Sequence, residues 1–172
     1  LAQQTHSEVV ALVVGPGNDE TFKALAAYGA DHVIALDDSQ VGHPIGTGYT
    51  AALADLVSQR NPYAVLLLAN ANGRDIASRV AARLGLGLTG DCIDLEINDE
   101  MEMVQMKPAL GGNVVAPIFS KTKPYLTTLR PGLLTPVEPD WSAEAPVERI
   151  EATRAAGPDI ELVESHLNED AQ

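Results

Sequence analysis

The chain has 172 residues, of which 45% are apolar and only 4% aromatic, so one core built mainly from aliphatic side chains is expected. Its formal net charge of −13 would repel nucleic acid and anionic lipid, which argues against both as main partners. The single cysteine, Cys92, excludes an internal disulfide and fits a reducing compartment, and no apolar run reaches membrane-spanning length.

The chain begins with alternating helix-like and strand-like segments. Residues 1–4 read like the end of a helix that runs directly into a strand, so we expect further residues before Leu1. A Val-rich strand over 8–14 leads into a Gly-rich turn over 15–17, which lacks the third glycine of a dinucleotide fingerprint. Asn18 or Asp19 is expected to cap the next helix and Gly29 to end it, before a second strand over 32–36.

The middle of the chain continues the alternation with stronger signals. A helix is expected over 47–60, followed by a strand over 63–69. Residues 65–68 are consecutive aliphatics, which is typical of a strand buried on both faces in the middle of a parallel sheet. A further helix is expected over 73–84, closed by Gly85, with Asp75 and Arg79 able to pair across one turn. The alternation predicts the α/β class: a three-layer α/β/α sandwich with a mostly parallel sheet.

After Gly85 the sequence becomes β-rich. Strand-like segments cover 88–97, 101–110, 113–120 and 125–129, and the short turns between them favour antiparallel C-terminal strands. Residues 131–146 are loop-like, 147–152 and 160–166 are candidate strands, and 168–172 resemble a frayed end. Ten of the 24 acidic residues lie within the 138–172 segment, which is either a solvated acidic end or a docking face for a basic partner.

The loop over 70–75 joins the most apolar strand to the clearest helix and is a candidate anion site. Free N–H groups at the helix start, at Asn72 and Gly73, together with the Arg74 guanidinium, could hold a phosphate. The alternative is structural, with Asn72 as an ordinary helix cap and Arg74-Asp75 as an ordinary first-turn pair.

A second cluster of cations, Lys121, Lys123 and Arg130, flanks the strand over 125–129 in an otherwise acidic chain. It is either a contact surface for an acidic partner or phosphate, or the charged rim of a hairpin.

Catalytic and metal-binding patterns are not found in the sequence. His6, His32, His43 and His166 share no ligand spacing, and no nucleophile elbow of the Gly-x-Ser-x-Gly kind occurs. We therefore expect no catalytic residues and no metal site, which disfavours a small hydrolase.

Residues 70–91, with the sequence Asn-Ala-Asn-Gly-Arg-Asp-Ile-Ala-Ser-Arg-Val-Ala-Ala-Arg-Leu-Gly-Leu-Gly-Leu-Thr-Gly-Asp, resemble the electron-transfer flavoprotein alpha subunit. The Gly-Arg-acid start, the Ala-Arg-Leu helix end and the Leu-Thr-Gly-Asp turn carry the resemblance. Three later segments agree in order and spacing: Pro-Ala-Leu-Gly-Gly-Asn at 108–113, Ser-Lys-Thr-Lys-Pro-Tyr at 120–125 and Thr-Leu-Arg-Pro-Gly at 128–132.

The resemblance implies an electron carrier and not an enzyme. In this family an alpha and a beta subunit form a heterodimer, and the alpha N-terminal domain is a Rossmann-like scaffold akin to adenine-nucleotide hydrolases. FAD lies chiefly in the alpha C-terminal domain, so no cofactor is expected in this chain. Electrons pass from flavin dehydrogenases, such as acyl-CoA dehydrogenases, to a quinone reductase. The location implied is the bacterial cytoplasm or the mitochondrial matrix.

The chain departs from the family pattern at both ends. The family's first strand is expected before Leu1, and the FAD domain is expected beyond the last residues, so residues 1–172 are expected to form one N-terminal domain. The alternative function is a stand-alone adenine-nucleotide-binding domain of the universal-stress-protein type. That class usually carries a long Gly-rich phosphate loop, whereas Gly111-Gly112-Asn113 reads better as a hairpin turn.

Overall fold

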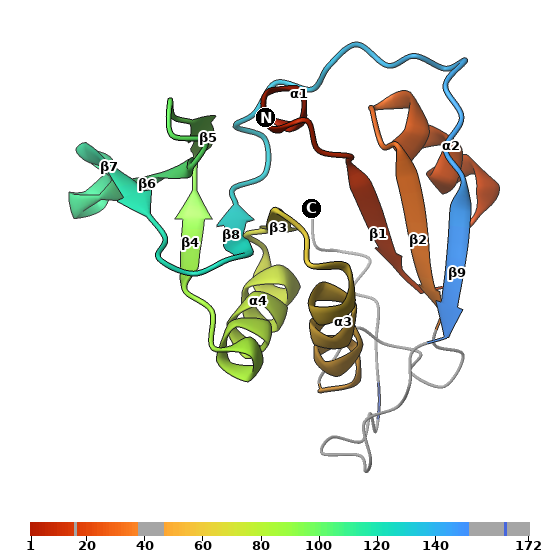
Figure 1. The fold of residues 1–172 in the computed structure, drawn as a ribbon, viewed down its shortest axis with the longest axis horizontal. Helices are drawn as coiled ribbons and strands as arrows, with labels where there is room; N and C mark the ends of the chain where they lie inside the picture. The colour runs from red at the N-terminus through yellow and green to blue at the C-terminus, as the bar shows by residue number, and fades with distance from the viewer. Residues whose placement is uncertain (16, 38–46, 152–163, 165–172) are drawn as a thin grey trace.

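The computed structural model describes residues 1–15, 17–37, 47–151 and 164, and it contains three sheets of three strands each (Figure 1). The first sheet has the order β1 (Val10–Val14), β2 (His32–Asp37), β9 (Val147–Glu151) and is parallel. The second has the order β3 (Ala64–Leu68), β8 (Tyr125–Leu129), β4 (Leu88–Cys92) and is also parallel. The third, β5 (Asp94–Ile97), β6 (Met103–Ala109), β7 (Val114–Phe119), is antiparallel. The predicted α/β class, mostly parallel with added antiparallel strands, is confirmed.

The helices begin and end at residues with clear local reasons. Asn18 caps α2 (Asp19–Ala27) by accepting a hydrogen bond from the Thr21 N–H at 2.7 Å. The helix α4 (Ala71–Leu84) ends at Gly85, whose φ of 66° is the left-handed conformation that glycine adopts without strain. Residues 1–4 were expected to end a helix, and a short helix, α1 (Ala2–Thr5), is found there. The remaining helices are α3 (Thr47–Arg60) and the short 3₁₀ turn η1 (Leu110–Gly112).

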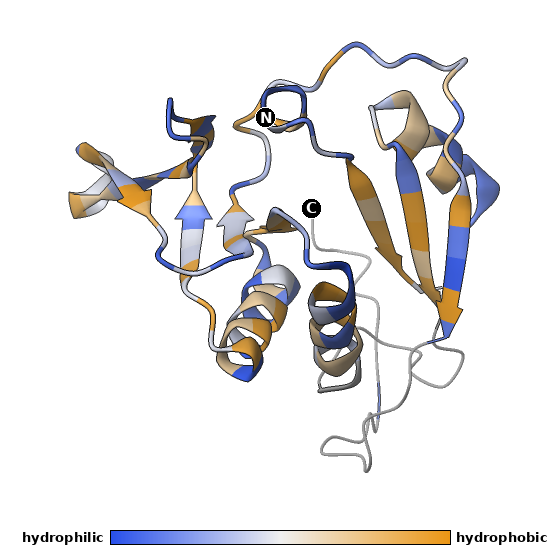
Figure 2. Cartoon of the chain, viewed as in Figure 1, coloured by the Kyte–Doolittle hydropathy of each residue, from blue (hydrophilic) through white to orange (hydrophobic). Residues whose placement is uncertain are grey.

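The core lies where the helices cover the parallel sheets. In α2, Phe22 packs against Val33 and Ala35 of β2. The helices α3 and α4 lie side by side beneath β3 and β8 (Figure 1), where Val57 and Val80 pack with Leu126 of β8. Figure 2 shows the apolar character of β1 and β2, in contrast to the polar segments of β9. Within the described part of the chain, no helix is long and apolar enough to cross a bilayer.

The prediction that residues 63–69 form a central, fully buried strand is wrong. Strand β3 is parallel as expected, but it lies at the edge of its sheet and pairs with β8 alone among the described strands. The side chains of Leu66 and Leu68 are 46% and 57% exposed. The central place belongs to β8, in which Tyr125, Leu126, Thr127 and Thr128 are buried. Because Thr127 donates a hydrogen bond to the Thr89 carbonyl at 2.7 Å, its hydroxyl is satisfied inside the sheet.

The prediction of antiparallel pairing after Gly85 is only partly correct. Strands β5, β6 and β7 are antiparallel, but β4 and β8 join β3 in parallel register. The segment over 88–97 also divides into two strands on either side of Ile93, so that β4 belongs to the parallel sheet and β5 to the antiparallel one. The division follows an irregular register between Thr89 and Cys92, where Asp91 has a positive φ of 69°.

The two parallel sheets face a shared core, and no strand of the described residues joins them. Leu12 of β1 and Leu67 of β3 both pack against the apolar cluster formed by α3, α4 and β8, yet β1 and β3 belong to different sheets. Among the described residues, β1 pairs with β2 alone, and Val10 and Val14 are exposed. The expectation that a further strand belongs beside these edges stays a prediction.

The late part of the chain is described only in part. The strand expected over 147–152 is confirmed as β9, which pairs in parallel with β2. The strand expected over 160–166 and the frayed end over 168–172 lie outside the described residues, apart from Glu164.

The burial of β8 predicts unequal effects of two leucine truncations. Leu126→Ala should lower the free energy of unfolding by roughly 2–5 kcal/mol, since it removes a fully buried side chain from the core. Leu66→Ala should cost less than about 1 kcal/mol, because that side chain is half exposed. Urea denaturation of both variants measures the difference. Equal losses would show that β3 is covered as fully as β8.

Candidate functional site

An acidic side chain and two arginines meet where strands β4 and β8 of the second parallel sheet end and helix α4 begins. Asp91 lies at the carboxyl end of β4, Arg130 directly follows β8, and Arg74 lies in the first turn of α4, which follows β3. Because β3, β8 and β4 are parallel, their carboxyl ends lie at the same end of the sheet. The Arg74 Nη2 lies 2.7 Å from Asp91 Oδ1, and the Arg130 Nη2 lies 2.8 Å from Asp91 Oδ2.

The backbone of β4 turns the Asp91 side chain toward this end of the sheet. The positive φ of 69° at Asp91 accompanies the irregular register of β4, and the Asp91 N–H donates a hydrogen bond to the Thr128 Oγ1 at 2.9 Å. A non-glycine residue in this backbone region is strained, so the surrounding contacts must hold it there. The two guanidinium groups and the Thr128 hydroxyl provide those contacts.

The electrostatics of the cluster favour the charged carboxylate. The hydrogen bond from Arg130 is the largest influence, and with the hydrogen bond from Arg74 it holds the pKa of Asp91 below its ordinary value, against the smaller opposing effect of burial. The same carboxylate raises the pKa of Arg130. The cluster is an ion triad that links β4, β8 and α4.

A shallow hollow of about 310 Å³ lies beside this ion triad. Lys107 of β6 reaches into it and donates a hydrogen bond from Nζ to the Gly90 carbonyl at 2.9 Å. The lining carries two cations, Arg74 and Lys107, and one carboxylate, Asp91, and each of the three has a partner among the described residues. The lining residues are Arg74, Ser78, Leu88, Gly90, Asp91, Lys107 and Thr128.

The hollow presents charged groups and hydroxyl groups of a few kinds. The hollow is lined by no cysteine, histidine or aromatic side chain. The described residues also contain no group of three or more His, Cys, Asp or Glu side chains that could hold a metal ion. Cys92 is fully buried, and burial raises the pKa of its thiol, as expected for a core residue.

The loop residues proposed for anion binding serve the local structure in different ways. The cap of α4 is Asn70, whose side chain accepts a hydrogen bond from the Gly73 N–H at 2.8 Å, so the expectation that Asn72 caps the helix is wrong. A side chain at Gly73 would collide with the Leu68 carbonyl oxygen, so the helix can start this close to β3 only with glycine here. Arg74 is engaged by Asp91. Anion binding by Asn72, Gly73 and Arg74 stays a prediction.

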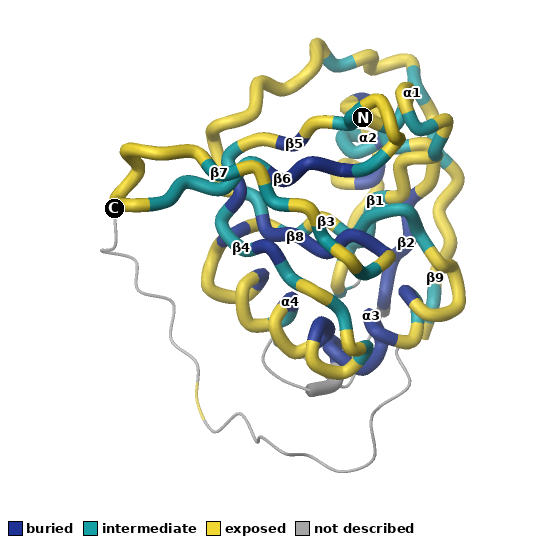
Figure 3. The backbone as a smooth tube through the Cα atoms, turned by 60° about the vertical axis from the view of Figure 1, so that its left-hand side comes forward, coloured by how far each residue is buried: buried dark blue, intermediate teal, exposed yellow. Residues whose placement is uncertain are grey.

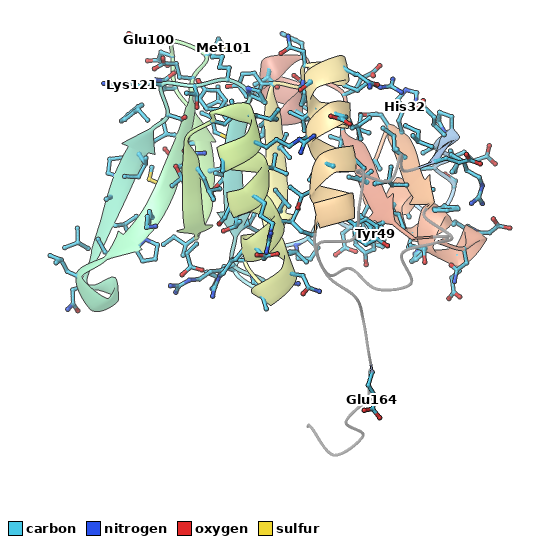
Figure 4. The ribbon with its side chains drawn as sticks, turned by 90° about the horizontal axis from the view of Figure 1, so that it is seen from below. His32, Tyr49, Glu100, Met101, Lys121 and Glu164 are labelled. Carbon is cyan, nitrogen blue, oxygen red and sulfur yellow. The ribbon has the colours of Figure 1, made fainter. Side chains whose placement is uncertain are left out.

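The cations grouped together in the sequence lie apart in the fold. Lys121 and Lys123 precede β8, whereas Arg130 follows it, so the whole strand separates them. Figure 4 shows Lys121 on the side of the molecule that also carries Glu100 and Met101. The Lys123 Nζ lies 5.5 Å from the centre of the Tyr125 ring. Arg130 instead shares the Asp91 carboxylate with Arg74, and these two arginines belonged to different candidate sites in the sequence.

Sequence reasoning did not single out Asp91 and Lys107 as site residues. Asp91 is 17 residues from Arg74 and 39 from Arg130, so only the order of the strands brings the three together. A usable signal existed, because Asp91 directly follows the Leu-Thr-Gly segment of an expected strand. Gly111 and Gly112 form part of η1 at the turn between β6 and β7, as expected for a hairpin and not for a phosphate loop.

Comparison with known proteins identifies the family. The profile described as "Electron transfer flavoprotein domain" matches residues 1–155. The electron transfer flavoprotein subunit alpha of Clostridium acetobutylicum is 37% identical over 135 residues, covering 77% of this chain and 40% of that protein. Protein FixB of Clostridium saccharobutylicum is 36% identical over 153 residues, covering 88% of this chain and 45% of that protein.

A subunit of a larger enzyme is similar to a comparable degree. The LctC subunit of the lactate dehydrogenase (NAD(+),ferredoxin) of Acetobacterium woodii is 37% identical over 131 residues, covering 76% of this chain and 31% of that protein. The chain spans less than half the length of these curated relatives. The chain belongs to the electron transfer flavoprotein family, and the resemblance to the N-terminal domain of the alpha subunit is confirmed.

The ion triad predicts a pH-dependent contribution to stability. Asp91→Asn should lower the free energy of unfolding at neutral pH by about 1 kcal/mol, the scale of screened ion pairs. Because the pKa of Asp91 is lower in the folded state, this difference should be present above the unfolded value near pH 4 and disappear as the pH falls through the folded value.

Urea denaturation from pH 2 to pH 7 measures this difference. Asp75→Asn is the matched control, because Asp75 pairs with Arg79 within α4 alone and its loss should cost less. A difference between wild type and Asp91→Asn that does not change with pH would contradict the ion triad.

The geometry also predicts weak nucleotide binding. AMP should not bind with micromolar affinity, because the hollow is shallow and has no aromatic side chain to stack an adenine ring. Isothermal titration calorimetry with AMP tests this, and micromolar affinity that is lost in Arg74→Ala would contradict it.

Proposed function

We propose that this chain is the scaffold and subunit-contact domain of a heterodimeric flavin electron carrier. The observation that carries the proposal is the family match over residues 1–155, together with alpha-subunit relatives that cover most of the chain. In this proposal the domain is an electron-carrier component and not an enzyme. The partner is the beta subunit of the same carrier.

The flavin belongs, in this proposal, to a part of the alpha polypeptide other than these residues. FAD is large and is usually held by stacking and by a closed pocket for its isoalloxazine ring. The hollow beside the ion triad is shallow and lined by no aromatic side chain, which suits a surface contact better than a flavin site. The domain would then shape the surroundings of a flavin that it does not itself hold.

The donors and acceptors of the carrier follow from the family and from the relatives. We infer that it takes electrons from flavin dehydrogenases, such as acyl-CoA dehydrogenases, and passes them to a quinone reductase. Two relatives support a link with dehydrogenases and reductases, since one is named a lactate dehydrogenase subunit and another an acryloyl-CoA reductase electron transfer subunit beta. The named relatives are bacterial, which favours the bacterial cytoplasm over the mitochondrial matrix.

The described residues suggest how the domain would serve as a scaffold. The ion triad of Arg74, Asp91 and Arg130 links α4, β4 and β8 at the carboxyl end of the sheet. Exposed cations at Lys121 and Lys123 lie at the opposite end of β8 and are available for contacts with carboxylates of a neighbouring domain or subunit.

The experiment is expression of the chain alone and of the complete alpha subunit with its beta partner. The chain alone should be colourless, whereas the complex should show flavin absorbance and be reduced in a dehydrogenase-coupled assay. Lys121→Glu combined with Lys123→Glu should weaken assembly, because both exposed cations lie at the same end of β8, and Lys23→Glu in α2 is the charge-reversal control. Stoichiometric FAD binding and reduction of the 172-residue chain alone would contradict the scaffold function.

A further inference from the structure

The cations in and beside the hollow use only part of their hydrogen-bonding capacity on their partners. The Arg74 guanidinium reaches Asp91 through Nη2 alone, and the Arg130 guanidinium reaches the other oxygen of that carboxylate through its own Nη2. Each guanidinium carries five N–H donors, and the Lys107 ammonium has three, of which one goes to the Gly90 carbonyl. Among the described residues no further acceptor contacts these three side chains, so most of their donors remain available to a bound group.

The hollow also has a positive local charge in a strongly acidic chain. Its lining contains Arg74 and Lys107, and Asp91 is the one carboxylate among the described lining residues. Arg130 lies on the far oxygen of the same carboxylate, so three cations are set against one anion. An excess of cations of this kind attracts a small anion even where the whole molecule is acidic.

The acidic residues of the neighbouring strand β5 do not neutralise this charge. Asp94 stands directly opposite Met106 of β6, and Glu96 shares the face of Asp94 two residues further on. Directly paired residues lie on the same face of a sheet, and successive side chains alternate between faces. Both carboxylates therefore lie on the other face of the antiparallel sheet from Lys107.

A missing side chain leaves a hydroxyl group open to the hollow. Gly90 and Thr128 both line it, and a Cβ at Gly90 would stand 3.7 Å from the Thr128 Oγ1. This oxygen accepts a hydrogen bond from the Asp91 N–H at 2.9 Å, and no acceptor for its own hydrogen is found among the described residues. Because Thr128 is buried and buried hydroxyl groups usually donate as well as accept, it provides a further donor for a group bound in the hollow.

Three separate elements place these donors around one space. Arg74 comes from α4, Thr128 from β8 and Lys107 from β6. Strand β6 is buried over its first three residues and intermediate from Met106 onward, so Lys107 lies where the strand approaches the surface (Figure 3). A planar guanidinium, an ammonium group and a hydroxyl group that come from different elements suit a tetrahedral oxyanion, because its oxygens point in several directions.

We propose that this hollow binds a phosphate group, held by Arg74, Lys107 and Thr128. The Asp91 carboxylate keeps the guanidinium in place while the remaining N–H groups meet the ligand. The backbone at the start of α4 takes no part through Gly73, because its N–H is already bonded to the Asn70 side chain.

The ligand is inorganic phosphate or a small phosphate ester. The hollow is shallow and its described lining has no aromatic side chain, so recognition acts on the phosphate itself and not on an attached base. The inference is independent of the proposed heterodimer and of the position of the flavin.

The test is a titration of the isotope-labelled chain with sodium phosphate, followed by two-dimensional NMR at an ionic strength held constant with sodium chloride. The amide signals of residues 74–78, 88–91, 107 and 128 should shift together and saturate in the millimolar range, as expected for a small and exposed site. A parallel titration with glycerol phosphate distinguishes free phosphate from a phosphate ester as the better ligand.

Three variants test the assigned contacts. Arg74→Gln and Lys107→Gln should each weaken phosphate binding by about tenfold, because each loses a charged hydrogen-bond donor. Lys107→Gln does so without removing a member of the ion triad. Gly90→Ala should also weaken binding, with no change in charge, because the added methyl group covers the Thr128 hydroxyl.

Arg79→Gln is the matched control. Arg79 lies on the same helix as Arg74 and is likewise paired with a carboxylate, that of Asp75, but it does not line the hollow. This variant loses the same charge and should bind phosphate like the wild type. Circular dichroism melting of each variant checks that the fold is kept.

Each outcome either supports or overturns the inference. Saturable shifts confined to the hollow, weakened in Arg74→Gln and Lys107→Gln and kept in Arg79→Gln, would support it with either ligand. Shifts that spread over the surface or do not saturate, or an equal loss in Arg79→Gln, would indicate only general attraction of anions and would overturn it. The absence of any shift with both ligands would overturn the phosphate site and leave the proposed function standing.

Discussion

The fold depends on one apolar cluster in which two separate parallel sheets share a core. Leu53 and Val57 of α3 and Val80 of α4 pack against Leu126 of β8, and Leu12 of β1 joins them from the other sheet. No described strand connects the two sheets, so their relative position rests on α3 and on contacts of this kind. Burial of aliphatic side chains is non-directional, and it therefore holds the sheets together without the hydrogen-bonded register that a continuous sheet would add.

Buried polar groups provide the directional contacts that the aliphatic cluster lacks. Thr89 of β4 donates a hydrogen bond to Gln105 of β6 at 2.6 Å, and the Gln105 amide reaches the Leu126 carbonyl of β8 at 3.5 Å. These bonds link the parallel sheet to the antiparallel one inside the protein, where a satisfied polar network is specific because its alternatives leave polar atoms unpaired. They fix β6 against the parallel sheet at the base of the β6–β7 hairpin.

The parts of the fold that local chemistry determines were predictable from the sequence. The cap at Asn18, the helix end at Gly85, the Asp75–Arg79 pair and the hairpin turn at 110–113 depend on residues within a few positions of one another. The order of the strands was not predictable in this way. A run of four aliphatic residues in β3 indicated a central strand, but the central strand is β8, which contains two threonines. Burial of these threonines is possible because Thr127 donates a hydrogen bond to the Thr89 carbonyl within the sheet. The ion triad was missed for the same reason, since Asp91 and Arg130 meet only once β4 and β8 are neighbours.

Lys107 links the ion triad to the β6–β7 hairpin, residues 103–119. Lys107 belongs to β6, and its ammonium group donates to the Gly90 carbonyl, one residue before Asp91. Strand β6 is therefore tied to β4, the strand that carries Asp91. Removing the Asp91 charge would take away the shared partner of the two arginines and weaken the turn of β4 to which Lys107 is bonded, so a change at the ion triad should reach β6. The contacts from α4 through Asp91 and Gly90 to β6 are continuous, so they join the helix, the parallel sheet and the antiparallel sheet.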